Sequence, residues 1–291
     1  MPFAPFTGVN HHYGSIQYGC AFLQDETELT FVWLFKAWLE AMGGRHPVSI
    51  ITDQDAAIGL ADRKVFPNTR HRLCLRHIKK KFGEKLSHIY FSKSKFKREL
   101  KICIHWTYEV HEFDEKWKTL IKDYNLHNNE WLTDLYDIRE KWVPIYHRNT
   151  FYAGMNTTGR NEGANSFFQD FVSPTTNLTE FVVRYDHAIT KIVQKEMKED
   201  YVSEHKDRVI FGKNLLLKHA ATIYTRNIFD KFQEQLVDSI RFKSEEIYCD
   251  EVSKTYLVKD KEGPAKFTVK LKPNTYEASC TCQYFEFMGL P

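Results

Sequence analysis

The first 23 residues have the pattern of a β-hairpin. Two apolar-rich runs, residues 3–10 and 15–23, are separated by the tetrapeptide His11-His12-Tyr13-Gly14. Two extended runs joined by a short Gly-containing segment are typical of antiparallel strands. The sequence therefore predicts a hairpin at this end of the chain.

A helix is predicted to follow the hairpin. Its apolar residues recur at helical spacing, as Val32, Phe35, Leu39 and Met42. Asp25, with Glu28 three residues later, has the form of a capping box that begins a helix. Gly43-Gly44 is a typical helix end.

A strand, a helix and a second strand come next, which is the order of an α/β fold. Residues 47–53 are a β-branched run ending in Asp53, residues 54–61 have a helical pattern, and residues 69–75 have that of a strand. In α/β folds, catalytic and ligand-binding groups lie at the carboxyl ends of strands, which makes Asp53 a candidate catalytic residue. An aspartate after a strand is more often a helix cap, and Asp55 could also serve as one.

The middle of the chain is predicted to be helical. Residues 95–142 have helical periodicity, and further helices are predicted to begin near residue 159 and to cover residues 178–199. Four tryptophans of the first segment are expected to anchor its packing: Trp106, Trp117, Trp131 and Trp142.

The last part of the chain changes character after a boundary within residues 238–249. Residues 255–258 and 267–271 have the pattern of strands around the turn Gly263-Pro264. The sequence therefore predicts a second, strand-containing region near the carboxyl end.

Charge is distributed unevenly, although the net charge is only +3. Residues 70–101 contain twelve Lys or Arg and two acids, whereas residues 104–140 contain nine acids and four basic residues. A basic segment of this density is typical of a nucleic-acid-binding surface, and a solvated helix face can have the same composition. The residues expected to contact DNA are Lys79, Lys80, Lys81, Lys95, Lys97 and Arg98.

Composition favours a folded intracellular protein. Hydrophobic residues make up 42% of the chain and aromatic residues 15%, which argues against wholesale disorder. No secretory signal and no membrane-spanning apolar run is visible in the sequence. The six cysteines are therefore expected to be reduced or bound to metal.

Two cysteine motifs have the spacing of zinc ligands. Cys74 and His77 are three positions apart and could bind zinc, although a buried cysteine and a packed histidine would give the same pattern. Cys280 and Cys282 could hold one zinc ion between them. A structural zinc site needs four ligands, so each pair is incomplete by itself.

Glu162 is the second candidate carboxylate. On a predicted helix it shares a face with Asn165 and Ser166, which could approach a metal ion or a phosphate, or could simply be solvated. Two-metal phosphoryl transfer needs several convergent carboxylates. Asp53 and Glu162 could supply two of them, but the hairpin strands carry no acid, so a magnesium site would lack a ligand.

Several stretches, taken in order, carry a family resemblance over nearly the whole chain. They are Met1-Pro-Phe-Ala-Pro-Phe-Thr-Gly-Val-Asn-His-His, Trp33-Leu-Phe-Lys-Ala-Trp-Leu-Glu-Ala-Met-Gly-Gly, Ile51-Thr-Asp-Gln-Asp-Ala-Ala-Ile, Phe66-Pro-Asn-Thr-Arg-His-Arg-Leu-Cys-Leu-Arg-His-Ile, Lys141-Trp-Val-Pro, Gly154-Met-Asn-Thr-Thr-Gly-Arg-Asn-Glu-Gly-Ala-Asn-Ser-Phe-Phe and Cys280-Thr-Cys. The chain resembles the far-red impaired response family of plants, whose members look like domesticated Mutator-like (MULE) transposases that act as nuclear transcription regulators.

This resemblance implies an α/β fold, namely an RNase H-like transposase core with a helical insertion. The core would cover residues 1–240, with the insertion at about 95–150, and an incomplete SWIM-type zinc-finger segment would cover residues 241–291. The expected order of elements is a hairpin, a helix, the strand ending at Asp53, and a long helical stretch before Glu162.

The resemblance also implies roles for individual residues. Asp53 matches the second Asp and Glu162 the Glu of an Asp–Asp–Glu catalytic pattern, whose first Asp would precede residue 1. Cys74 and His77 match the Cys-x-x-His element between them. Cys280 and Cys282 match the first half of a SWIM motif, and the family's amino-terminal zinc finger has no counterpart.

The implied function is that of a non-enzymatic nuclear regulator that binds DNA and forms homodimers or heterodimers with family members. No association with a membrane is expected. An active magnesium-dependent transposase and a non-functional transposase fragment are the alternatives; the incomplete catalytic pattern disfavours the first. Zinc is expected at the SWIM segment, and magnesium only if the transposase site is active. Because half a zinc site supplies little folding energy, the chain after Tyr276 is expected to be poorly ordered.

Overall fold

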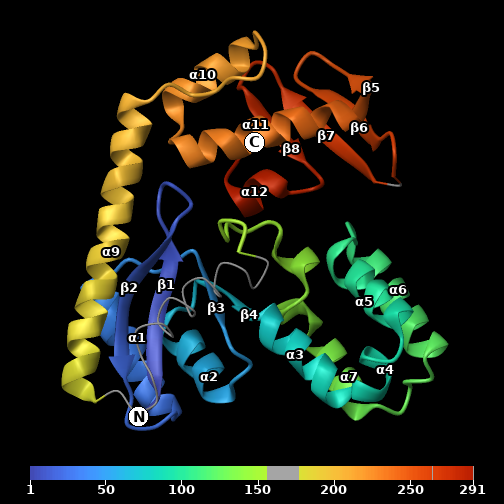
Figure 1. Cartoon of the computed structure of the whole chain (residues 1–291). Helices are drawn as coiled ribbons and strands as arrows, with labels where there is room; N and C mark the ends of the chain where they lie inside the picture. Colours follow the sequence, from blue (N-terminus) through green and yellow to red (C-terminus); the bar gives the residue numbers. More distant parts are fainter. Residues whose placement is uncertain (156–176, 264, 291) are drawn as a thin grey trace. The chain divides into compact units, whose positions relative to one another are not determined.

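The computed structural model describes residues 1–155, 177–263 and 265–290, and the chain divides into two units (Figure 1). The first unit comprises Met1–Pro2, Leu23–Thr157 and Cys280–Gly289, and the second comprises Phe3–Phe22, Thr158–Ser279 and Leu290–Pro291. Both helices and strands are present, so the fold is mixed α/β.

The second unit begins with the predicted hairpin. Strands β1 (Phe3–Val9) and β2 (Ser15–Phe22) pair antiparallel from Phe3 opposite Phe22 to Val9 opposite Ser15. The register shifts after Phe6. Gly19, near this shift, has a φ of +132°, a backbone conformation that residues other than glycine rarely adopt.

Helix α9 (Leu178–His205) runs alongside this hairpin (Figure 1). The Phe181 ring lies 5.4 Å from that of Phe3 and 4.5 Å from that of Phe22, measured between centroids, in edge-to-face contact. Asn177 caps the helix by accepting a hydrogen bond from the Glu180 backbone N–H. The helix predicted over residues 178–199 is confirmed and is six residues longer.

The remainder of the second unit is a helix pair followed by a sheet. Helices α10 (Leu215–Ile223) and α11 (Arg226–Asp238) pack through a small apolar cluster that includes Leu217, Phe229 and Phe232. A short 3-10 helix, Ser239–Arg241, leads into the sheet.

The sheet has the order β5-β6-β7-β8. Its strands are β5 (Phe242–Cys249), β6 (Lys254–Asp260), β7 (Lys266–Lys272) and β8 (Glu277–Cys280). The two predicted strands are confirmed as parts of β6 and β7. Strand β5 was not predicted, because it is almost wholly exposed and lacks alternating buried apolar residues. Its side chains instead make polar contacts across the sheet, such as Lys259 Nζ to Glu245 Oε2 at 3.0 Å.

The first unit begins with helix α1 (Glu28–Ala41), whose end at Gly43-Gly44 is confirmed by φ values of +64° and +74°. The predicted cap at Asp25 is wrong. Thr27 caps the helix through the Thr30 N–H, while the Asp25 carboxylate accepts hydrogen bonds from the backbone N–H and hydroxyl of Thr27 and from the Thr30 hydroxyl.

Helix α1 packs through large apolar side chains. Phe31, Leu34 and Phe35 are buried, and the Phe35 ring lies 5.2 Å from that of Phe66. Of the four apolar residues whose spacing predicted the helix, only Phe35 is fully buried, and Val32, Leu39 and Met42 are half-buried. Since α1 is apolar on more than one side, packing rather than periodicity selects the face.

A parallel strand pair follows α1. Strand β3 (Ser49–Thr52), helix α2 (Ala56–Val65) and strand β4 (Arg70–Leu73) form a strand–helix–strand unit in which β3 and β4 are parallel. The predicted α/β order of this region is confirmed. The two carboxyl ends lie side by side because Thr52 is opposite Leu73.

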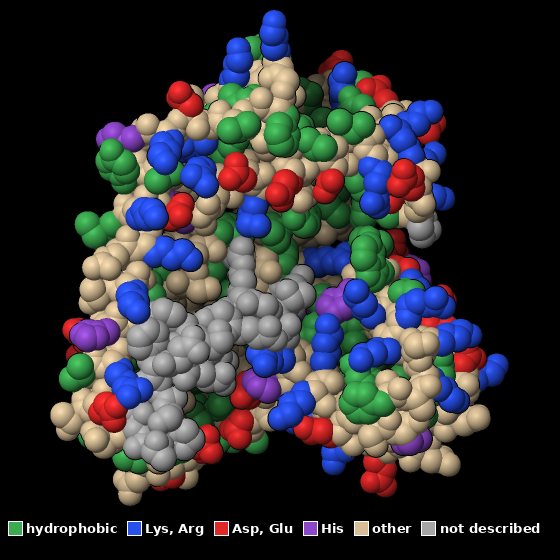
Figure 2. Space-filling model, viewed as in Figure 1, with side chains coloured by type: hydrophobic (Ala, Val, Ile, Leu, Met, Phe, Trp, Pro, Cys, Tyr) green, Lys and Arg blue, Asp and Glu red, His purple; other side chains and the backbone are tan. Residues whose placement is uncertain are grey.

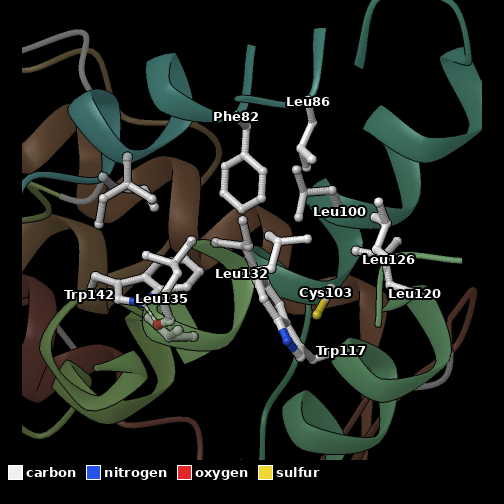
Figure 3. Close-up of a cluster of buried hydrophobic side chains, with 14 of the residues drawn as sticks. Phe82, Leu86, Leu100, Cys103, Trp117, Leu120, Leu126, Leu132, Leu135 and Trp142 are labelled. Carbon is white, nitrogen blue, oxygen red and sulfur yellow. Dashed lines mark hydrogen bonds between the residues drawn. The ribbon is translucent and has the colours of Figure 1, made fainter. Parts of the chain in front are cut away.

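A group of helices makes up much of the rest of the first unit (Figure 1). The group consists of α3 (Leu75–Lys85), α4 (Ser87–Tyr90), α5 (Ser94–His105), α6 (Val110–Asp123), α7 (Glu130–Asp137) and the 3-10 helices Arg139–Lys141 and Pro144–His147. Their core is drawn in Figure 3, where Phe82, Trp117 and Leu132 point toward one another. The helical prediction for residues 95–142 is therefore confirmed.

The four tryptophans of this region do not share one environment. Trp117 and Trp142 are buried in the core, and Trp131 is partly buried against it. Trp106, at the end of α5, is 55% exposed, so its predicted role as a packing anchor is wrong.

The chain after Tyr276 also differs from expectation, because it forms β8 and helix α12 (Tyr284–Met288). Within the first unit, the Tyr152 backbone N–H donates to the Phe287 carbonyl at 3.1 Å, and the two rings lie 5.9 Å apart. Phe287 is only 5% exposed. Apolar burial therefore orders this segment where zinc was thought necessary.

Candidate functional site

Asp53 and Cys74 follow directly after the two parallel strands, so the pairing of β3 with β4 places them together. The Cys74 backbone N–H donates to the Thr52 carbonyl at 2.7 Å, which extends the ladder to the end of the pair. Cys74 is buried and is the residue immediately before α3, while Asp53 is exposed.

His77 completes the group from the first turn of α3. Its Nδ1 lies 2.6 Å from Asp53 Oδ1, although the orientation is not that of a hydrogen bond. One ligand atom each from Asp53, Cys74 and His77 lies within 4.8 Å of the others. The predicted pairing of Cys74 with His77 therefore has the geometry of a site, and Asp53 joins it.

Asp53 is not the cap of α2. The Asp55 carboxylate caps that helix by accepting the Ile58 backbone N–H at 2.9 Å. Gln54, between the two aspartates, accepts a hydrogen bond from Lys81 Nζ at 2.9 Å, which ties this loop to α3. The Asp53 carboxylate is therefore left to face His77 and Cys74.

A buried polar network borders the strand pair on its β4 side. His71 Nε2 lies 2.7 Å from the Thr52 hydroxyl, and His71 Nδ1 lies 3.4 Å from Asp62 Oδ2. Burial lowers the pKa of His71 to about 4 and raises the pKa of Asp62 to about 6. His71 is therefore neutral at pH 7, so the contact is not a full ion pair.

Glu162, the other candidate carboxylate, lies outside the described residues, as does the helix predicted to begin near residue 159. Its approach to Asp53 stays a prediction.

Cys280 and Cys282 lie against one another near α12. The Cys282 backbone N–H donates to Cys280 Sγ at 3.5 Å. A hydrogen bond between the two thiols, together with the nearby charge of Arg148, lowers the pKa of Cys282 to about 6, and the same hydrogen bond raises the pKa of Cys280. Metals bind the thiolate form of cysteine, so a metal held by this pair would displace the thiol protons.

Neither cysteine belongs to a metal-capable group of three within the part of the chain that the structure describes. Two such groups occur there: Asp53, Cys74 and His77, and a group in the second unit formed by His11, His12 and Asp200. One hint of the second group is visible in the sequence, namely the adjacent histidines in a predicted turn. Nothing in the sequence connected them with Asp200.

The predicted DNA-contacting residues lie on α3 and α5, and Figure 2 shows Lys and Arg side chains gathered at the surface over these helices. Lys80, Lys95, Lys97 and Arg98 are exposed. Lys79 differs, because it is partly buried with Nζ 2.8 Å from His105 Nε2, and burial lowers its pKa.

Comparison with known proteins identifies the class to which these features belong. A model of the MULE transposase domain matches residues 1–81, which include Asp53, Cys74 and His77. This part of the chain is therefore similar to a transposase domain. No solved structure matches it.

Full-length similarity narrows the class to one family. The chain is 42% identical to Protein FAR1-RELATED SEQUENCE 5 of Arabidopsis thaliana, over 100% of this chain and 37% of that protein. It is 36% identical to Protein FAR-RED IMPAIRED RESPONSE 1 (99% and 35%) and 35% identical to Protein FAR1-RELATED SEQUENCE 9 (100% and 53%), both from Arabidopsis thaliana. The chain belongs to the far-red impaired response family, and it spans between about a third and a half of these relatives.

Among the described residues, no helix combines the length and the apolar character needed to cross a membrane.

Proposed function

We propose that this chain is the DNA-contacting, transposase-derived core of a plant nuclear transcription regulator. Family membership supports a regulator of transposase origin. The proposal includes an RNase H-like fold, which is supported by the order of the β1–β2 hairpin, the strand β3, the crossover helix α2 and the strand β4. Nuclear location is part of the proposal.

The basic surface of α3 and α5 is the observation that carries this proposal. Helix α3 has five Lys or Arg and α5 has four, against one acid on each helix. Such a surface neutralises phosphates and releases their counterions, which drives binding without regard to sequence.

The exposed basic groups are only weakly engaged within the chain. Lys95 Nζ lies 3.6 Å from Glu99 and Lys80 Nζ lies 3.8 Å from Glu84, both as exposed i,i+4 pairs. Pairs of this kind contribute only about 0.3–0.5 kcal/mol, so a phosphate can replace the carboxylate at little cost. Lys97 Nζ lies 4.7 Å from the centroid of the Tyr90 ring, and the Lys97 side chain is exposed to solvent.

Neutralising Lys95 and Arg98 together should weaken binding to duplex DNA of any sequence. Each lost phosphate contact should reduce the slope of log affinity against log salt by about 0.9, so the double alanine variant should lose up to about 2. Fluorescence anisotropy with two unrelated duplexes, over a series of salt concentrations, measures this.

Lys118 and Lys122 provide the matched control, because both are exposed lysines on α6, in the acidic segment. Their double alanine variant has the same change in net charge and should keep the original slope. Equal losses for both pairs would show that only net charge matters. If the protein binds no DNA at low salt, the proposal that α3 and α5 form a DNA-binding surface is wrong.

The donor set of Asp53, Cys74 and His77 favours zinc over magnesium. Thiolate and imidazole are zinc ligands, whereas magnesium prefers carboxylate, phosphate and water oxygens. Three protein ligands within reach of one another would leave the fourth zinc position to water or to a further residue. This supports a zinc-stabilised regulator over an active magnesium-dependent transposase, which is the second candidate function.

Replacement of Cys74 by Ser should remove a thiolate-bound metal. In the cobalt-substituted protein, the sulfur-to-cobalt absorption should fall in Cys74→Ser and stay unchanged in Cys249→Ser, whose cysteine is exposed and outside the group. Identical spectra for the two variants would exclude Cys74 as a ligand. Loss of strand-transfer activity in Asp53→Asn, if the protein has such activity with Mg²⁺, would favour the transposase instead.

The remaining parts of the proposal concern the end of the chain and its partners. We propose that Cys280 and Cys282, whose Sγ and backbone N–H are in contact, are the first two ligands of a SWIM-type zinc site. We also propose that the chain associates with a second copy of itself or with other family members. Sedimentation of the purified protein over a range of concentrations tests self-association.

A further inference from the structure

The β1–β2 turn holds two adjacent histidines in a fixed conformation. The Asn10 side-chain oxygen accepts hydrogen bonds from the backbone N–H groups of His12, at 3.0 Å, and Gly14, at 2.8 Å. The His11 carbonyl accepts a further hydrogen bond from the Thr225 hydroxyl at 2.8 Å. The backbone of both histidines is thus held by contacts that do not involve the imidazoles.

Both imidazoles meet the same carboxylate on α9. His11 Nε2 lies 2.7 Å and His12 Nε2 lies 2.9 Å from Asp200 Oδ1. One ligand atom from each residue lies within 4.8 Å of the other two. All three residues belong to the second unit, and none of them is part of the Asp53 site.

Glu196, one turn before Asp200 on α9, orients the first histidine. Its Oε1 lies 3.6 Å from His11 Nδ1. A carboxylate at the far nitrogen favours a proton there and leaves the Nε2 lone pair for a metal, which is the usual arrangement around metal-bound histidine.

Two buried polar atoms lie without hydrogen-bond partners beside this group, within the described part of the chain. His12 is only 2% exposed, and its Nδ1 has no such partner. Glu199 Oε2 is likewise buried and unpaired, and Glu199 and His12 both line a pocket of about 470 Å³ between the turn and α9. Buried polar atoms usually have protein or water partners, so this pocket is suited to hold water and a polar ligand.

We propose that His11 Nε2, His12 Nε2 and Asp200 Oδ1 bind a zinc ion, with water from this pocket completing the coordination. Two imidazoles and one carboxylate are a common zinc set with an open position. Magnesium and calcium would instead require mainly oxygen ligands. The ion would replace the direct contacts of the two histidines with Asp200. It would link the turn of the hairpin to α9, with His12 and Asp200 188 residues apart in sequence.

The test is zinc binding to the chelator-stripped full chain and to His11→Gln, Asp200→Asn and Glu196→Gln variants. His187→Gln is the matched control, because it removes an exposed histidine of α9 from outside the group. Competition with a chromophoric chelator gives stoichiometry and affinity, and circular dichroism checks that each apo variant is folded.

The wild-type chain should bind about one zinc ion more than Asp200→Asn or His11→Gln, while His187→Gln should match the wild type. Glu196→Gln should keep the ion with about 10–100-fold weaker affinity. The cobalt difference spectrum, wild type minus Asp200→Asn, should lack sulfur-to-cobalt absorption, which separates this site from Cys74, Cys280 and Cys282.

Equal zinc stoichiometry in wild type, His11→Gln and Asp200→Asn would overturn the proposal and leave Asp200 as a hydrogen-bond acceptor for two histidines. A sulfur band in the difference spectrum would also overturn it. Neither readout depends on DNA binding, so the proposed function and this site can fail independently.

Discussion

Replacement of Trp142 by alanine should lower the free energy of unfolding by about 3–5 kcal/mol. The side chain is fully buried, with its ring centroid 6.0 Å from that of Trp117 and 6.3 Å from that of Phe113. Its Nε1 donates to the Leu135 carbonyl at 2.9 Å (Figure 3). Truncation would leave a cavity and an unpaired buried carbonyl. Urea unfolding followed by circular dichroism measures the change.

Two further variants separate the causes of this loss. Trp142→Phe fills most of the cavity but lacks the N–H donor, so it should cost less, about 1–3 kcal/mol. Trp106→Ala removes the same atoms from a residue that is 55% exposed and should change stability by no more than about 0.5 kcal/mol. Similar losses in Trp106→Ala and Trp142→Ala would contradict the assignment of the core.

The tryptophans illustrate what the sequence could predict in this region. Helical periodicity over residues 95–142 located the helices, because long amphipathic patterns are strong local signals. It could not tell which tryptophans are buried. Trp106 lies at the end of α5, beyond the face that carries Phe96, Leu100 and Cys103, and this depends on where the helix stops.

Local chemistry was similarly informative at the strand pair. A β-branched run ending in Asp53, followed by a helix and a second strand, predicted the α/β order that β3, α2 and β4 have. The spacing of Cys74 and His77 places both at the start of one helix, so their proximity could be read from sequence. Asp53 joins them only through the parallel register of the two strands, which no local pattern determines.

Contacts between distant segments account for what the sequence could not predict. The segment after Tyr276 is ordered by Phe287 against Tyr152, a contact across 135 residues that no local pattern predicts. The meeting of His11 and His12 with Asp200 depends on the packing of α9 along the hairpin. Such pairings follow from tertiary packing, which composition and periodicity leave open.

Unfolding of the first unit should become much easier as the pH falls from about 6.5 to 4. Burial lowers the pKa of His71 and His105 to about 4 and that of His147 to about 3, with the charges of nearby basic residues adding to the effect. Since the unfolded values are about 6.5, the unfolded chain binds more protons in this range. The stability from these histidines is fully present above pH 6.5 and is lost below it.

Asp62 opposes this trend over part of the same range. Burial raises its pKa to about 6, so the folded chain holds a proton that the unfolded chain releases above about pH 4. Three histidines minus one aspartate leave a net uptake of roughly two protons on unfolding, or a slope of about 2.7 kcal/mol per pH unit. Unfolding free energies from urea titrations at several pH values give this slope.

His147→Phe should reduce that slope by about 1.4 kcal/mol per pH unit, because one titrating group is removed. The Tyr152 hydroxyl loses its contact with His147 Nδ1 but keeps the Arg70 carbonyl as an acceptor at 3.1 Å. Asp62→Asn should make the slope steeper, because it removes the group that holds a proton in the folded chain over part of this range. A His147→Phe slope equal to that of the wild type would mean that His147 is protonated in the folded protein, despite its complete burial.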